Sequence, residues 1–269
     1  MKYKKKRSAK RTGRMVIYIL PNLFTSASLF GGFYAIIAAI QGRYEAAAIA
    51  IIISAMLDGL DGRIARFTHT SSHFGSEYDS LSDLVAFGVA PGILAFSWAL
   101  KLFGRLGWLA AFMYVICGAL RLARFNVQKN SVEATYFKGL PIPAAACFIA
   151  TLTLFTKAMG GFSGNGHIII IIMIYILSFL MVSTINYFSF KEFDIRNQRP
   201  FHVLVSIILV SILIAYEPKI LLFFIMLAYV VSGPVITIYR LHKKGSHVMK
   251  PAHHISTIND DKEIKELNN

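Results

Sequence analysis

Four aspartates within one short stretch, residues 58–83, are the side chains best suited to chemistry. Asp58 and Asp61 are three residues apart and Asp79 and Asp83 are four apart, so each pair shares one face of a helix. Apolar runs flank the stretch, and an aspartate at the centre of a membrane helix costs roughly 2.5–3.5 kcal/mol. Four carboxylates this close need a counter-charge, which two divalent cations would supply. All-oxygen ligands favour Mg²⁺ or Mn²⁺ over zinc.

A pair of such ions points to chemistry at phosphorus. Two divalent cations held about 3.5–4 Å apart clamp phosphate oxygens and stabilise a displacement. One carboxylate can then serve as general base toward an attacking hydroxyl. Gly59 and Gly62 lie between and beside the first two aspartates. Gly62 favours close approach of a ligand to the backbone, whereas for Gly59 close helix packing is an equal alternative.

The elements that position the aspartates are membrane helices. The 269-residue chain is 55% hydrophobic, above the roughly 45–50% of soluble domains. Apolar runs approach the ~20 residues needed to cross a bilayer, and a sheet with open edges cannot span lipid. The sequence therefore predicts an all-α, polytopic bundle of about eight transmembrane helices, with six or seven as the main alternative. The predicted spans are residues 20–40, 44–64, 79–100, 106–126, 140–159, 167–189, 201–216 and 218–239.

The distribution of basic residues predicts the orientation. The net charge is +14, and basic residues crowd residues 1–14, the C-terminal tail and alternate connections between spans. The other side holds only Arg43, Lys101, Arg105, Lys157 and Lys219. By the positive-inside rule both termini are cytoplasmic, which fits an even number of spans. Because the basic N-terminus adjoins a membrane span, it favours anionic lipid headgroups over nucleic acid.

This topology brings the aspartates together at the cytoplasmic face. Span two ends near residue 66, and span three starts near residue 78 on the same side. A short connection makes the two helices antiparallel neighbours, so both aspartate pairs can converge. The predicted organisation is a basic cytoplasmic leader (1–14), a membrane catalytic domain (15–240) and a polar cytoplasmic tail (241–269).

The aspartate stretch follows the pattern D-x2-D-G-x2-A-R-x8-G-x3-D-x3-D, and in this it resembles the CDP-alcohol phosphatidyltransferase family. The residues that carry the resemblance are Asp58, Asp61, Gly62, Ala65, Arg66, Gly75, Asp79 and Asp83. The resemblance implies a six-helix membrane core with a metal site at the cytosolic face, extra spans in some members, and a homodimer.

The family's residue roles carry over by this resemblance. Asp58, Asp61 and Asp79 would hold one metal ion, and Asp58, Asp79 and Asp83 the second. Asp83 would also be the general base in a direct displacement without a covalent enzyme intermediate. The nucleotide would be bound by Asp61, Gly62, Ala65, Arg66 and Gly75.

Four further stretches, at 74–81, 86–91, 121–126 and 139–144, resemble the phosphatidylserine synthase branch of the family. This implies transfer of the phosphatidyl group from CDP-diacylglycerol to L-serine, with release of CMP. The candidates for binding serine or phosphate are Arg121, Arg124, Asn126, Lys138 and Glu77. Arg121 is the first choice for the serine carboxylate because arginine pairs a carboxylate bidentately, although an arginine can also simply cap a span on the cytoplasmic side.

Two alternatives remain open. The signature cannot separate serine from another acceptor alcohol, such as glycerol 3-phosphate, inositol phosphate or choline. A cation transporter would also use intramembrane carboxylates. A transport path, however, should place polar groups deeper in several spans, and span one and spans six to eight offer few.

Overall fold

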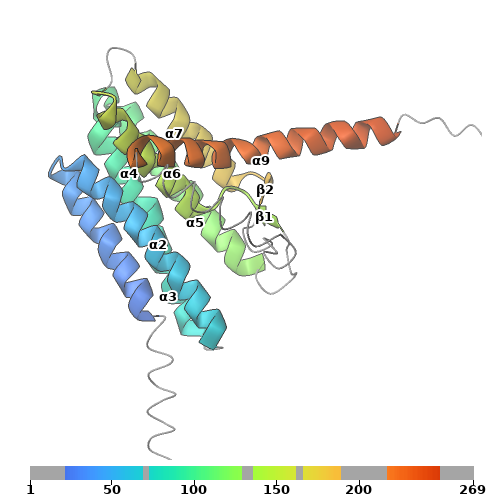
Figure 1. Ribbon diagram of the computed structural model, residues 1–269, viewed down its shortest axis with the longest axis horizontal. Coiled ribbons are helices and arrows are strands. Elements are labelled where there is room, and N and C mark those ends of the chain that lie inside the picture. The colour runs from blue at the N-terminus through green and yellow to red at the C-terminus, as the bar shows by residue number, and fades with distance from the viewer. Residues whose placement is uncertain (1–21, 69–72, 129–135, 162–165, 189–216, 249–269) are drawn as a thin grey trace, which may run out of the picture.

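The computed structural model describes residues 22–68, 73–128, 136–161, 166–188 and 217–248. The first helix, Asn22–Ile40, is followed by α2, Tyr44–Thr68, after a tight turn. Gly42 turns the chain with φ +76°, while its N–H and that of Arg43 donate to the carbonyls of Ala39 and Ala38. This is a glycine-terminated helix end, which favours a residue without Cβ in the left-handed conformation. The turn makes the first helix and α2 neighbours (Figure 1).

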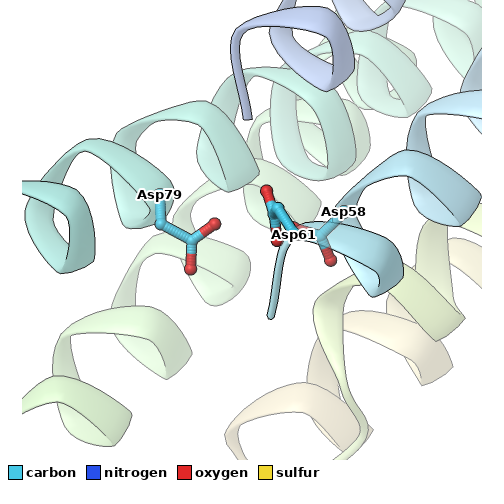
Figure 2. Close-up of side chains that lie close together, drawn as sticks. All are labelled: Asp58, Asp61 and Asp79. Atoms are coloured by element: carbon cyan, nitrogen blue, oxygen red, sulfur yellow. The ribbon is translucent and has the colours of Figure 1, made fainter. Parts of the chain in front are cut away.

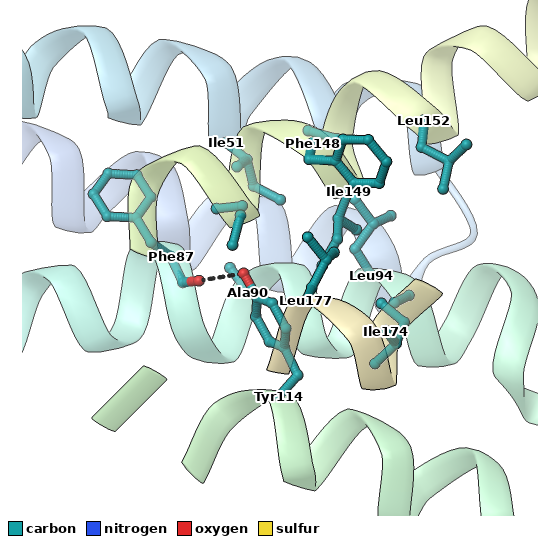
Figure 3. Close-up of a cluster of buried hydrophobic side chains, with 14 of the residues drawn as sticks. Ile51, Phe87, Ala90, Leu94, Tyr114, Phe148, Ile149, Leu152, Ile174 and Leu177 are labelled. Atoms are coloured by element: carbon teal, nitrogen blue, oxygen red, sulfur yellow. Dashed lines mark hydrogen bonds between the residues drawn. The ribbon is translucent and has the colours of Figure 1, made fainter. Parts of the chain in front are cut away.

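The next span is one long helical run, His73–Phe103, with changes of winding inside it. It consists of α3 (His73–Asp83), a π segment (Leu84–Val89), α4 (Ala90–Ala95), a second π segment (Phe96–Leu100) and a 3₁₀ turn (Lys101–Phe103). Pro91 has no N–H to donate to the carbonyl of Phe87, which lies four residues earlier. The buried Tyr114 hydroxyl donates to that carbonyl instead, at 3.0 Å (Figure 3). The first π segment begins directly after Asp83.

The second half of the described chain consists of α5 (Arg105–Gln128), β1 (Tyr136–Lys138), α6 (Ile142–Ala158), α7 (Gly166–Val182), β2 (Asn186–Phe188) and α9 (Pro218–Val248). The strands pair antiparallel, with Tyr136 opposite Phe188 and Lys138 opposite Asn186. The sequence interpretation missed both strands and extended the sixth span to residue 189, whereas α7 ends at Val182. Strands of three residues leave too little alternation in the sequence to be recognised.

Small side chains fill much of the core. Ala35, Ala47, Ala86 and Ala90 are fully buried, as is Phe87, and alanine lets neighbouring helix backbones approach closely. Figure 3 shows the larger members of the core, which converge from α2, α4, α5, α6 and α7. Many large apolar side chains remain exposed on the outer faces, as a protein surrounded by lipid requires.

The predicted helical class is confirmed, whereas the count of eight spans is not. Four helices within the described residues are long and apolar enough to cross a membrane: Asn22–Ile40, His73–Phe103, Arg105–Val127 and Pro218–Tyr239. Two shorter apolar helices, Ile142–Ala158 and His167–Val182, lie within the predicted spans 140–159 and 167–189. The predicted second span corresponds to α2, which is not among the four. The predicted span 201–216 lies outside the described residues.

Candidate active site

Three of the four aspartates form one compact cluster. Carboxylate oxygens of Asp58, Asp61 and Asp79 all lie within 4.8 Å of one another. Figure 2 shows Asp79, on α3, directed toward Asp58 and Asp61 on α2. Asp61 is buried, and the other two are half-buried. The helices converge as expected from their antiparallel arrangement, and the connection between them is shorter than predicted because α2 extends to Thr68 and α3 already begins at His73.

Asp83 joins the same group through Asp58. The two side chains lie within hydrogen-bonding reach of each other, which two ionised carboxylates do not favour. Within the described part of the chain, no lysine or arginine forms an ion pair with Asp58, Asp61 or Asp83. This oxygen-only donor set, at this spacing, fits hard divalent cations. Bound cations would relieve the repulsion among the carboxylates.

Arg121 lies close by in an unusual state for an arginine. Its side chain is buried on α5, and the residue is only 8% exposed. It interacts electrostatically with Asp83 and with Tyr229 of α9. Its Nε has no hydrogen-bond partner among the described residues. A buried, incompletely satisfied guanidinium is costly unless an anion binds there, so this geometry suits an anionic group of a substrate.

The guanidinium of Arg124, one turn further along α5, is already hydrogen-bonded to main-chain carbonyls. Its guanidinium donates to Val182 (3.0 Å), Lys138 (3.1 Å) and Ser183 (3.2 Å). These bonds join α5 to the end of α7 and to β1, which makes Arg124 a structural clamp. Lys138 is exposed and lies in β1. Binding of substrate by Arg124 or Lys138 stays a prediction.

Asn126 and Glu77 are placed differently from each other. The Asn126 amide donates to the Ser80 hydroxyl at 2.9 Å, and that hydroxyl donates to the Ser76 carbonyl at 3.0 Å. Asn126 therefore ties α5 to α3 beside Asp79. Glu77 is exposed on α3. The structure thus gives Asn126 a helix-bridging contact that the sequence interpretation did not foresee, and the role of Glu77 stays a prediction.

The predicted nucleotide-binding residues lie on α2 and α3. Gly62 is exposed, and a Cβ built there or at Gly59 would meet no atom within 4 Å in the described chain. Neither glycine is therefore needed for close helix packing there, and the open space suits approach of a ligand. Gly75 lies in the first turn of α3. The side chains of Ala65 and Arg66 lie outside the described residues, although both belong to α2.

Sequence reasoning missed two residues next to the cluster. The Thr25 hydroxyl of the first helix donates to Asp61 Oδ2 at 2.8 Å. The Ser82 hydroxyl of α3 donates to the Thr25 carbonyl at 3.1 Å. Both residues are buried. The available sequence signal was the presence of hydroxyl residues in an otherwise apolar helix, which is weak because such residues commonly bond their own helix.

Comparison with known proteins identifies the fold family. The sequence profile of CDP-alcohol phosphatidyltransferases matches residues 18–185, which include all four aspartates. The chain belongs to the CDP-alcohol phosphatidyltransferase family. Together with its apolar helices, membership makes this a multi-pass membrane protein. The resemblance drawn from the aspartate pattern is thereby confirmed.

Several relatives carry names within this family. A CDP-diacylglycerol–serine O-phosphatidyltransferase of Helicobacter pylori is 43% identical over 176 residues, covering 65% of this chain and 74% of the relative. The protein of that name from Mycobacterium leprae is 32% identical over 236 residues, covering 84% and 77%. An archaetidylserine synthase of Methanothermobacter thermautotrophicus is 39% identical over 170 residues, covering 62% and 69%. These three relatives, whose names all contain serine, thus each match more than half of this chain.

Proposed function

We propose that this protein transfers the phosphatidyl group of CDP-diacylglycerol to L-serine, giving phosphatidylserine and CMP. The names of the similar enzymes support serine as the acceptor. The observation that carries the proposal within this chain is the convergence of Asp58, Asp61 and Asp79, together with a buried Arg121 that interacts electrostatically with Asp83. The aspartates suit a diphosphate bound with divalent cations, and the arginine suits the carboxylate of an amino acid.

Four aspartates would hold the cations, which are Mg²⁺ or Mn²⁺. Asp58, Asp61 and Asp79 would hold one ion, and Asp58, Asp79 and Asp83 the other. When bound, the ions supply positive charge to the diphosphate oxygens of the donor lipid. Gly62 and Gly75, with Ala65, Arg66 and Asp61, would bind the nucleotide.

Asp83 would act as the general base. Its carboxylate accepts the proton of the serine hydroxyl while the hydroxyl oxygen bonds to the phosphorus that carries the diacylglycerol. The bond from that phosphorus to the bridging oxygen breaks, and CMP leaves with the electron pair. The contact between Asp83 and Asp58 supports this assignment, because it places Asp83 beside the carboxylates that would hold the cations.

Arg121 would orient the acceptor. Its guanidinium would pair the serine carboxylate, and its electrostatic interaction with Asp83 supports placing the serine hydroxyl near the base. Glu77, Lys138, Arg124 and Asn126 are further candidates for acceptor or phosphate contacts. Of these, Arg124 and Asn126 already donate to protein groups, so they are weaker candidates.

The same proposal covers orientation and assembly. We place both termini and the aspartate cluster on the cytoplasmic side, because most of the 28 lysines and arginines are predicted there. The leader (1–14) and the tail (241–269) would flank a membrane catalytic domain (15–240). A homodimer is proposed from the family resemblance, and cross-linking in membranes would test it.

The testing experiment measures CMP release by purified protein in detergent with CDP-diacylglycerol and Mn²⁺. L-serine, glycerol 3-phosphate, inositol 1-phosphate and choline are supplied one at a time. Release that depends on serine and stops with a chelator supports the proposal. Release only with another acceptor would retain the metal site and refute serine. No release with any acceptor from folded protein would refute the transferase proposal and favour a cation-binding role.

A further inference from the structure

We propose that Thr25 is a positioning residue for Asp61, so that the first helix sets the affinity of the site for divalent cations although it supplies no cation ligand. The inference rests on the proposed function, because it assumes that Asp61 binds a metal ion. Nothing in the aspartate signature involves the first helix. The contacts of Thr25 with both aspartate-bearing helices carry the argument.

The first contact fixes the Asp61 carboxylate. Thr25 Oγ1 donates to Asp61 Oδ2 at 2.8 Å, across 36 residues of sequence. Thr25 is 4% exposed and Asp61 is 5% exposed, so water competes little for this bond. A hydrogen bond from a neutral donor to a ligand carboxylate fixes its orientation. The Gly62 main chain also bonds this carboxylate, so Thr25 is its side-chain donor from another helix.

The second contact fixes Thr25 itself. The Ser82 hydroxyl donates to the Thr25 main-chain carbonyl at 3.1 Å, and Ser82 directly precedes Asp83. One residue later in the first helix, the hydroxyls of Ser26 and Tyr78 share a hydrogen bond of 2.8 Å, and Tyr78 directly precedes Asp79. The first helix is therefore bonded to α2 at Asp61, and to α3 beside both of its aspartates.

Close packing sets the depth of Thr25 along the bundle. Thr25, Ser28, Gly32, Ala35 and Ala39 are spaced by three and four residues, and all are buried along one helix face. A Cβ at Gly32 would overlap Ala86 of the π segment, and one at Gly31 would overlap the Ser54 hydroxyl of α2. Gly32 lies about 10 Å along the helix from Thr25. Because the helix cannot slide past these contacts, Thr25 is held level with the aspartates.

The hydrogen bonds of other buried threonine hydroxyls provide a comparison for Thr25. Thr151, Thr153 and Thr156 of α6 donate to carbonyls of their own helix. This is the usual role of a threonine in an apolar helix. Thr25 differs because its hydroxyl reaches a carboxylate on another helix. Thr153, which is 1% exposed, therefore provides a matched control for the same substitution.

The test measures Mn²⁺ binding to substrate-free protein in detergent by electron paramagnetic resonance of free Mn²⁺. Thr25→Val keeps the shape of the side chain and removes its hydroxyl, and the expected rise in Kd is about 10- to 100-fold. Thr25→Ser retains the hydroxyl and should keep a Kd near that of the wild type, as should Thr153→Val. Saturating Mn²⁺ should restore most of the kcat of Thr25→Val, which a merely structural defect would not allow.

The outcomes separate this inference from the proposed function. Wild-type protein that binds no Mn²⁺ would refute this inference, whereas the proposed transferase function is refuted only by the absence of CMP release with every acceptor. Wild-type binding with an unchanged Kd in Thr25→Val would refute only the role of Thr25. An equal rise in Thr153→Val would also refute it, because the effect would then come from any buried threonine. If Thr25→Val does not fold, Thr25→Ala, which adds no atoms, replaces it in the comparison with Thr25→Ser.

Discussion

Replacing Arg121 by lysine should selectively weaken the binding of serine. The change keeps one positive charge near Asp83, but it removes the planar guanidinium that can pair a carboxylate through two hydrogen bonds. Arg121 is 8% exposed, so little water can substitute for the lost bond. The proposed donor-binding residues are elsewhere, on α2 and α3. The variant should therefore distinguish acceptor binding from donor binding.

The magnitude follows from the bond that lysine cannot make. A hydrogen bond to a charged group contributes about 1.5–3 kcal/mol, and 1.4 kcal/mol corresponds to about a tenfold change in affinity. The expected result is a rise in the KM for serine of about 10- to 150-fold. The KM for CDP-diacylglycerol should be unchanged. Both values come from CMP release with one substrate varied and the other saturating.

A matched control lies on the same helix. Arg105 is exposed at the opposite end of α5, so Arg105→Lys should leave both KM values unchanged. An unchanged KM for serine in Arg121→Lys would refute the assignment of Arg121 to the acceptor. A selective rise in the KM for CDP-diacylglycerol would instead assign the guanidinium to a phosphate of the donor.

Three further predictions test the base, the core and the far end of the bundle. Asp83→Asn should lower kcat by about 10²- to 10⁴-fold without loss of fold, because the base is removed; near-normal kcat would exclude Asp83 as base. Tyr114→Phe should lower the free energy of unfolding by about 1 kcal/mol, since the Phe87 carbonyl loses a buried donor; unchanged denaturant midpoints would contradict this. Glu45→Gln should remove ion pairs with Lys157 (3.2 Å) and Lys219 (2.9 Å) at less than about 1 kcal/mol per exposed pair. It should leave both KM values unchanged, and a changed KM would show that this end of α2 influences the site.

The convergence of the aspartates could be predicted because it depends on local spacing. The three- and four-residue intervals define helix faces, and a short connection between α2 and α3 brings those faces together. The sequence indicates Arg121 by its charge and its place at the end of a span, and its binding of serine stays a prediction. These features depend on helix periodicity and on charge, which the sequence displays directly.

Contacts between helices distant in sequence could not be predicted in the same way. Thr25 and Thr153 are both hydroxyl residues in apolar helices, and only the structure shows which hydroxyl crosses to a neighbour. The bonds from Arg124 to three carbonyls depend on where α7 ends, and the sequence interpretation placed that end too late. The sequence interpretation also did not predict the π segment that follows Asp83.

The last helix has a consequence for how the protein is made. The four aspartates lie within residues 58–83 and α9 begins at Pro218, so a ribosome delivers all four aspartates before it reaches α9. Until α9 is made, Glu45 has no ion pair with Lys219, and the Tyr187 ring cannot pack against Gly233. The ring of Phe155 in α6 also cannot yet stack on the ring of Phe223; in the complete structure the two ring centroids are 4.5 Å apart. A nascent chain stalled at this stage would hold the entire aspartate cluster while leaving one face of α6 open to lipid or to an insertion factor.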